Sequence, residues 1–191
     1  IDTWNTTGVT NMDGLFENQD TFNENIGGWD VSDVTSMMNM FKGASTYNNG
    51  GSTEIDTWDV RKVTNMSGMF DGASAFNQPL NPGWDVSEVT SMINMFKNAT
   101  SFDKELNAWD VSKVKNMSGM FSDATAFNQD IGSWNVSAVT DMSRMFSDAT
   151  IFNQDIGSWD VSGVTDMSNM FAIAIDFKQN LQSWPNNPSG G

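Results

Sequence analysis

Residues 58–80 read WDVRKVTNMSGMFDGASAFNQPL, and this stretch carries the full apolar pattern of a unit that recurs along the chain. Aligned on its tryptophan, the unit reads W-[DN]-V-S-x-V-T-x-M-x-x-M-F-x-x-A-x-x-F-N-x-x-[IL]. The eight tryptophans are separated by 25, 29, 26, 25, 25, 25 and 25 residues. They are Trp4, Trp29, Trp58, Trp84, Trp109, Trp134, Trp159 and Trp184. A fixed period of this length predicts a solenoid, in which each unit buries its apolar face against its neighbours.

The spacing within this unit predicts two short elements. Trp58 and Val60 alternate with Asp59, as in a strand with one buried face. Four apolar residues then have the i, i+3, i+4, i+7 spacing of an amphipathic helix, and Thr64 is placed to cap it. They are Met66, Met69, Phe70 and Ala73. We therefore expect an α/β solenoid, a leucine-rich-repeat-like stack of seven units, each with a short parallel strand and a short helix.

The repeat covers residues 1–184, which we expect to form a single domain. Residues 185–191 are rich in Pro, Gly and Asn, which is typical of a tail or linker. The predicted core contains the tryptophan row and the apolar residues of the expected helix. Its members include Trp29, Trp58, Trp84, Trp109, Trp134, Trp159, Met66, Met69 and Phe70.

Departures from the repeat give further expectations. Lys115 replaces the capping threonine of its unit, so we expect a weaker helix start there. A row of asparagines follows the second aromatic residue of the unit and is expected to satisfy turn backbone groups. Asp103 and Lys178 break this row. Insertions at residues 48–54 and 82–83 both fall on the return segment, a face that tolerates or uses variation.

The chain is strongly acidic, with 24 acidic and 9 basic residues and a formal net charge of −15. This balance disfavours nucleic acid and anionic membranes as partners, because both prefer a basic surface.

No stretch reaches the roughly 18–20 apolar residues of a membrane-spanning helix. The chain has no Cys and no His, which removes nucleophile–histidine catalysis and the usual zinc ligands. We therefore expect neither enzyme activity nor a cofactor.

Calcium binding is the alternative to a chain without cofactors, because one row of aspartates could supply the ligands. These residues follow the tryptophan, and they could form a ladder of cation ligands or each bond to its own turn. The row contains Asp30, Asp59, Asp85, Asp110 and Asp160, with Asn135 in one unit.

Five Asn-x-Ser/Thr sequons are candidate sites for attached glycans, although chance gives roughly four in a chain of this composition. They begin at Asn5, Asn65, Asn98, Asn116 and Asn135. Asn65 and Asn116 share one repeat position, so glycans on these two residues would project from one face.

The signature W-D-V-S-x-V-T-x-M-x-x-M-F-x-x-A-x-x-F-N-Q resembles the repeat of BspA-like surface proteins, a divergent relative of leucine-rich repeats found in bacterial and mycoplasmal surface lipoproteins. Residues 134–154 match nearly every position, and the resemblance covers residues 1–184. It implies a leucine-rich-repeat-like stack at a cell surface that is associated with adhesion. It implies no catalytic residue.

We therefore expect a non-enzymatic extracellular or cell-surface protein that acts as an adhesion or protein-interaction module. The alternative is a structural subunit of an extracellular filament, assembled by head-to-tail stacking of solenoid ends that does not close. Trp4 and Trp184 would form the self-assembly ends, because they occupy the same phase of the repeat. An ice-binding stack with an exposed threonine row is a third interpretation, which the expected capping role of the threonines disfavours. The expected partner is another protein or a second copy.

Overall fold

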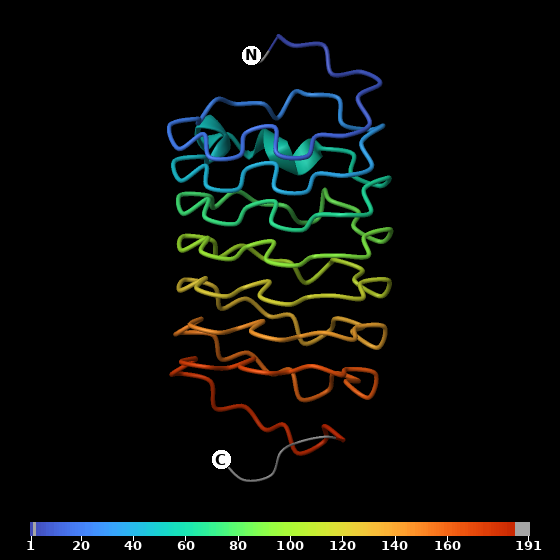
Figure 1. Ribbon diagram of the computed structural model, residues 1–191, viewed down its shortest axis with the longest axis vertical. Helices are drawn as coiled ribbons and strands as arrows, with labels where there is room; N and C mark the ends of the chain where they lie inside the picture. The colour runs from blue at the N-terminus through green and yellow to red at the C-terminus, as the bar shows by residue number, and fades with distance from the viewer. Residues whose placement is uncertain (2, 186–191) are drawn as a thin grey trace.

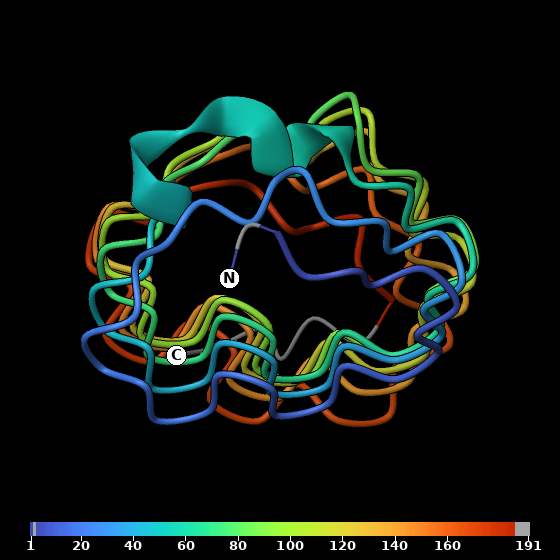
Figure 2. The same ribbon diagram turned by 90° about the horizontal axis from the view of Figure 1, so that it is seen from above.

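The computed structural model describes residues 1 and 3–185. The chain winds through successive coils that are stacked along one axis (Figure 1). Viewed along this axis, the coils superpose as one oval outline (Figure 2). Isolated parallel bridges join neighbouring coils at the residue after the conserved threonine position. The pairs are Asn11–Ser36, Ser36–Asn65, Asn65–Ser91, Ser91–Asn116, Asn116–Asp141 and Asp141–Asp166.

Regular secondary structure is nearly absent from the described part of the chain. Its helices are two short 3-10 helices, η1 (Asn49–Gly51) and η2 (Thr53–Thr57), and its strand pairing is limited to isolated bridges. Both helices lie at the insertion on the return segment. The expected α/β solenoid of strand-and-helix units is therefore wrong, because the coils are built from tight turns.

The predicted helix is instead a pair of consecutive turns. Within residues 66–73, the Met69 N–H donates to the Met66 carbonyl at 3.2 Å, and an equivalent bond closes the second turn. The Gly68 N–H leaves the coil and donates to the Ile93 carbonyl of the next coil at 2.7 Å. An α-helix would direct this N–H to the carbonyl four residues back in the same segment. Two four-residue turns in succession produce the same apolar spacing as a helix.

Each pair of turns contains two residues with left-handed backbone, which is the physical reason why no helix forms. This conformation interrupts a right-handed helix and is costly for most residues other than Gly, Asn and Asp. The first left-handed position holds Gly14, Asn39, Gly68, Asn94, Gly119, Arg144 and Asn169. The second left-handed position holds Asn18, Gly43, Gly72, Asn98, Asp123, Asp148 and Ile173. All but two of these residues are Gly, Asn or Asp, a turn signal that the sequence contained.

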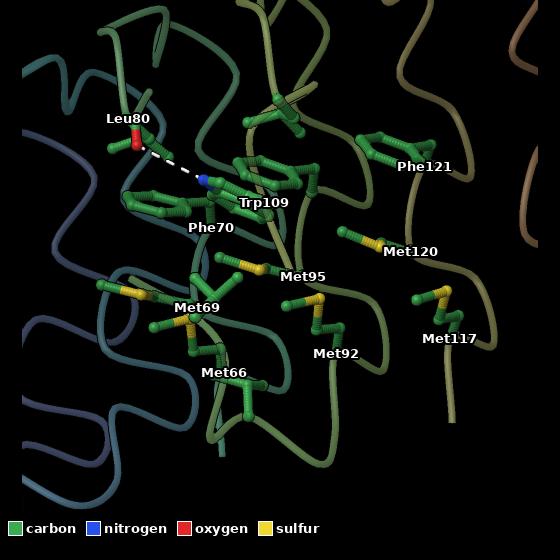
Figure 3. Packing of buried hydrophobic residues seen from close by; sticks show 14 of the residues in the cluster. Met66, Met69, Phe70, Leu80, Met92, Met95, Trp109, Met117, Met120 and Phe121 are labelled. Carbon is green, nitrogen blue, oxygen red and sulfur yellow. Dashed lines mark hydrogen bonds between the residues drawn. The ribbon is translucent and has the colours of Figure 1, made fainter. Parts of the chain in front are cut away.

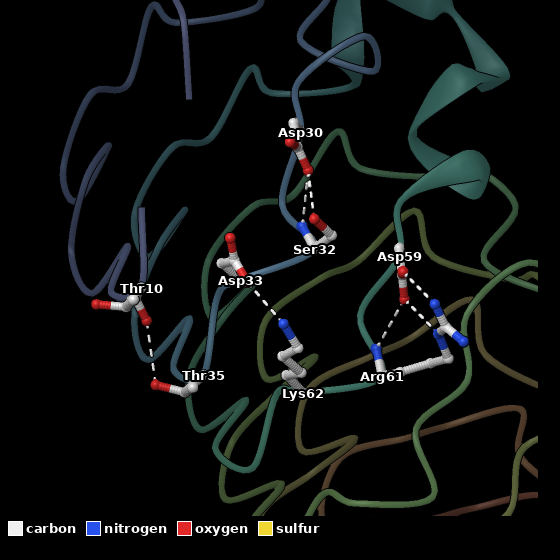
Figure 4. Close-up of polar contacts among 8 residues, drawn as sticks. All are labelled: Thr10, Asp30, Ser32, Asp33, Thr35, Asp59, Arg61 and Lys62. Atoms are coloured by element: carbon white, nitrogen blue, oxygen red, sulfur yellow. Dashed lines mark hydrogen bonds and ion pairs between the residues drawn. The ribbon is translucent and has the colours of Figure 1, made fainter. Parts of the chain in front are cut away.

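The threonines connect coils and do not cap helices. The Thr35 hydroxyl donates to the Thr10 carbonyl of the preceding coil at 3.1 Å, beside a backbone bond between the same residues (Figure 4). Thr64 makes the same two bonds to Thr35. The weaker helix start expected at Lys115 is wrong, because no helix forms there. The Lys115 N–H still donates to the Thr90 carbonyl at 2.9 Å, so the connection between coils continues.

The asparagine row satisfies backbone N–H groups of the following coil. The Asn128 Oδ1 accepts from the Asn153 N–H at 2.9 Å, and the Asn153 Oδ1 accepts from the Lys178 N–H at 2.9 Å. Asp103 does not break this row, contrary to expectation, because its Oδ1 accepts from the Asn128 N–H at 3.1 Å. A carboxylate therefore performs the same task as an amide oxygen here. Lys178 ends the row, because an ammonium group has no acceptor.

Three columns of aromatic rings run along the core. The phenylalanines between the two left-handed positions stack from coil to coil at centroid distances of 5.5–5.8 Å. Each also stacks on the second aromatic residue of its own coil at 3.9–4.1 Å. In the third column, the Trp109 Nε1 donates to the Leu80 carbonyl at 3.3 Å, and methionines line the adjoining core (Figure 3). Each phenylalanine of the first column in the middle of the stack is thus packed between the equivalent rings of the two neighbouring coils.

The structure buries the residues that the sequence assigned to the core. Each exposes at most 5% of its surface: Trp29, Trp58, Trp84, Trp109, Trp134, Trp159, Met66, Met69 and Phe70. The insertion is anchored to the stack by the buried Asn49, whose Oδ1 accepts from the Ile26 N–H at 2.9 Å. Its Nδ2 donates to the Ser52 carbonyl at 2.9 Å, so the amide is satisfied on both sides.

Tyr47 stands in the second aromatic column at a place where the other coils have Phe. Its hydroxyl is buried and has no hydrogen-bond partner among the described residues, and burial raises the pKa of Tyr47 well above its usual value. We expect Tyr47→Phe to raise the free energy of unfolding by about 1 kcal/mol, because it removes an unsatisfied polar group. Urea denaturation measures this change.

The same substitution should alter the response to alkaline pH. The unfolded chain releases the tyrosine proton near pH 10, whereas the folded chain retains it, so stability falls as the pH rises above about 10. In the Tyr47→Phe variant, the free energy of unfolding should fall less steeply as the pH rises above about 10. A variant that is less stable than the parent at pH 7 would contradict the assignment of an unsatisfied hydroxyl.

Candidate functional site

An open polar groove runs along one flank of the stack, across four coils from Asn94 to Ile173. It has a volume of about 630 Å³. Its walls are the two left-handed positions, which project at the corners of successive coils. The groove is lined by Asn94, Lys97, Ser118, Gly119, Ser122, Asp123, Ser143, Arg144, Ser147, Asp148, Asn169, Ala172 and Ile173.

The groove opens at the coils in which a small residue directly follows the phenylalanine that lies between the two left-handed positions. In early coils this place holds long charged residues, and Lys42 lies 3.7 Å from Glu17 across two coils. In later coils it holds Ser122, Ser147 and Ala172, which leave the space between the two corners empty. Small side chains in three successive coils therefore leave room for the groove, and Lys97, at the same position of the preceding coil, lines it as well.

Two serines form the floor of the groove and orient acidic side chains. Ser122 and Ser147 are buried, and each hydroxyl donates to the carboxylate of the next residue, Asp123 or Asp148, at 3.0 Å. Each carboxylate thus has one oxygen held in place by its own coil. The repeated Ser-Asp pair presents the same acceptor on two neighbouring coils.

The groove also contains the two residues that depart from the turn pattern. Arg144 has φ 57° and Ile173 has φ 59°, at positions where every other coil has Gly, Asn or Asp. For a β-branched residue such as Ile, this backbone is a clear outlier. Backbone strain of this kind costs on the order of 1–3 kcal/mol and gathers at functional sites. Both exceptions line one groove, which makes the groove the strongest candidate site in the described residues.

Backbone groups along the groove are already engaged between coils. The Gly119 N–H donates to the Ser143 carbonyl at 2.8 Å, and the Asp123 N–H donates to the Ser147 carbonyl at 2.8 Å. In the last coil of the groove, no backbone acceptor among the described residues takes the Asn169 or Ile173 N–H, so a ligand meets side chains along most of the groove and two backbone donors at this end. Lys97 and Arg144 form no ion pair with the described residues, unlike Lys42, Arg61, Lys62 and Lys113. The two groove cations are free to meet an anionic group.

The aspartates after the tryptophans bond to their own turns. The Asp30 Oδ1 accepts from the Ser32 hydroxyl at 2.7 Å and from the Ser32 N–H at 3.1 Å (Figure 4). These bonds lower the pKa of Asp30 below its usual value, with the hydroxyl contributing most. Asp59 pairs with Arg61 in the same way. The equivalent bonds in other coils are made by Asp85, Asp110, Asn135 and Asp160. Among the described residues, no three Asp, Glu, His or Cys side chains gather as they would around a metal ion.

The sequons lie on several parts of the surface. Asn5 and Asn135 are exposed, whereas Asn65, Asn98 and Asn116 are half-buried. The Asn116 Nδ2 donates to Asp141 at 3.1 Å, and the Asn98 Nδ2 donates to Asp71 at 3.3 Å. Because a glycan is attached through Nδ2, Asn5 and Asn135 are the most accessible acceptors.

The two predicted self-assembly ends differ from each other. Trp4 is 54% exposed and lines an apolar hollow of about 490 Å³ with Leu15 and Trp29. Trp184 is buried, and its ring lies 6.5 Å from Phe171, in the place that a further coil's tryptophan would occupy. A second copy that continued the stack in register would need its Trp4 to take this same place. The expected tail, residues 185–191, lies outside the described residues except for the exposed Pro185.

Sequence reasoning did not single out the groove residues. The signal was present in Arg144 and Ile173, which depart from a column of Gly, Asn and Asp, but their conformation was hidden while the segment was interpreted as a helix. No described helix is long and apolar enough to cross a membrane.

The chain belongs to the family described as "Mycoplasma protein of unknown function, DUF285", whose model matches residues 1–82 and again residues 82–184. The double match agrees with the internal repeat, since each copy covers several coils. No curated protein matches the chain.

Proposed function

We propose that this member of the DUF285 family is a non-enzymatic binding module of the cell surface, and that the groove along its later coils receives the partner. The observation that carries this proposal is the pair of strained residues, Arg144 and Ile173, on one groove. A stack of constant coils with a variable outer row suits this task, because the outer row changes without disturbing the core.

The resemblance to BspA-like surface repeats supports an extracellular or cell-surface location and a role in adhesion. The acidic surface supports a protein partner over nucleic acid, because a net charge of −15 repels phosphate backbones. Glycans on Asn5 and Asn135 would leave this proposed site clear, since neither residue lines the groove.

The proposal predicts that stability and binding respond in opposite directions. Arg144→Asn and Ile173→Asn each place a turn-compatible residue at a left-handed position and should raise the free energy of unfolding by about 1 kcal/mol. The same variants should bind the partner at least tenfold more weakly, because they remove the groove's cation or its exposed aliphatic side chain. Urea denaturation measures the first effect.

Adhesion of coated beads to cultured epithelial cells and immobilised matrix proteins measures the second effect. Lys113→Asn and Met38→Asn are matched controls, because they remove an exposed cation and an exposed aliphatic side chain away from the groove. Adhesion that survives in both groove variants would refute the groove as the binding site.

The filament alternative makes a different prediction for the same samples. Light scattering of the untagged chain should then show mass that grows with concentration and falls when Trp4 is replaced by Glu. A constant monomer mass would leave the binding module as the function, because a subunit of a filament must associate with its own copies.

A further inference from the structure

We propose that the end of the groove at Arg144 and Ile173 recognises a segment of a partner protein in which a carboxylate side chain stands next to an aliphatic one. This inference rests on the proposed function and names the chemistry that the groove selects. It follows from the charge and the exposed apolar surface of the last two coils.

Arg144 supplies the anion-binding half of this site. Its side chain is exposed on the groove wall and forms no ion pair with the described residues. A guanidinium group binds a carboxylate through two parallel hydrogen bonds, a geometry that fixes orientation as well as charge. The other six coils hold Gly or Asn at this first left-handed position, so Arg144 is the one long cation in that row.

Ile173 supplies the aliphatic half on the groove wall, and Ile151 and Ile175 are also exposed on the last two coils. Ile173 is 62% exposed, Ile175 69% and Ile151 41%, where most other coils have polar residues. The two coils are held side by side at this corner, because the Asp176 N–H donates to the Thr150 carbonyl at 3.1 Å. Exposed aliphatic side chains beside a polar groove are typical of protein interaction sites.

The rest of the groove argues for a protein segment and against a nucleic acid. Asp123 and Asp148 line the same groove as the cations, so a chain with a phosphate at every step would meet acidic oxygens there. A peptide carries charge only at chosen residues and can place N–H groups or a basic side chain over these aspartates. The Arg144 and Asp148 N–H groups are bonded to the last coil, so Arg144 and Ile173 must distinguish one segment from another through their side chains.

A titration followed by ¹⁵N NMR tests this inference on the intact chain. The probe is an acetylated, amidated hexapeptide with a central Glu-Leu pair between Gly and Ser residues, added up to about 5 mM because short flexible segments bind weakly. We expect saturable shifts at the amides of Arg144, Asn169 and Ile173. Matched peptides with Gln-Leu or Glu-Ser should bind about tenfold more weakly.

Protein variants separate the two halves of the site. Arg144→Asn should remove the difference between the Glu-Leu and Gln-Leu peptides, and Ile173→Asn should remove the difference between Glu-Leu and Glu-Ser. Arg144→Lys should retain part of the preference, because it keeps the charge and loses the paired hydrogen bonds. Thermal denaturation confirms that each variant is folded.

Two outcomes overturn this inference, and they differ in what they imply for the proposed function. No saturable shift, or shifts away from the groove, refutes the carboxylate–aliphatic chemistry; if bead adhesion still depends on Arg144 and Ile173, the groove remains the binding site. If adhesion is also unchanged in both variants, the proposed function fails as well.

Discussion

Phe121→Ala is expected to lower the free energy of unfolding by about 3–5 kcal/mol, the cost of removing a fully packed aromatic side chain. Phe121 is completely buried and stacks at 5.7 Å on Phe96, at 5.8 Å on Phe146 and at 4.0 Å on Phe127. The cavity would lie in the middle of the phenylalanine column, between the two neighbouring coils whose rings pack on Phe121. Because the turns have little secondary structure of their own, the coils cannot compensate locally.

Phe171→Ala is the matched control for this prediction. Phe171 occupies the same position in the last coil and is only half-buried; it stacks on Phe146 and Phe177 and lies 6.5 Å from Trp184, but no phenylalanine of a following coil stacks on it in the described chain. Its removal should cost clearly less than that of Phe121. Equal losses in guanidinium denaturation would mean that stacking between coils is not the main source of stability.

Gly83→Ala is expected to lower the free energy of unfolding by about 3 kcal/mol, because the added methyl group has no room. A Cβ at Gly83 would overlap the carbonyl oxygen of Asp56 and lie 2.8 Å from its carbonyl carbon. Asp56 belongs to η2, so the inserted helix approaches the stack at a point where only a hydrogen fits. Backbone atoms cannot rotate away as a side chain would, so the coil or the insertion must move.

Gly28→Ala tests whether this cost is local. Both glycines directly precede a tryptophan, Trp29 or Trp84, but a Cβ at Gly28 meets no atom within 4 Å. This variant should therefore be as stable as the parent or slightly more stable, since alanine restricts the unfolded chain. A similar loss in both variants would place the effect in the turn rather than in the contact with η2.

The core residues were predictable because burial leaves a direct mark on the sequence. Trp, Val, Met and Phe recur at fixed phase, and a residue that must pack against its equivalent in the next unit cannot vary freely. The asparagine row was predictable for the same reason, since each amide serves the next coil. These features depend on the period of the repeat and not on the path of the chain within it.

The path within the unit was mispredicted at residues 66–73. Apolar spacing alone does not distinguish an amphipathic helix from two successive turns, whereas Gly68 and Gly72 are the residues that permit the turns. Their left-handed conformations send N–H groups to the next coil, which replaces a local hydrogen-bond network by one between units. The groove could not be predicted from the helix interpretation, because its walls are these turn corners.

The sequence by itself determined that this chain is a stack of repeating units with a buried aromatic core, an acidic surface and no histidine or cysteine chemistry. Only the tertiary structure decided that the units are turns, that Trp184 fills the next tryptophan place, and that Arg144 and Ile173 share one groove. The physical reason is that periodic burial is encoded residue by residue. The direction of each N–H and the meeting of side chains 29 residues apart arise only when neighbouring coils pack.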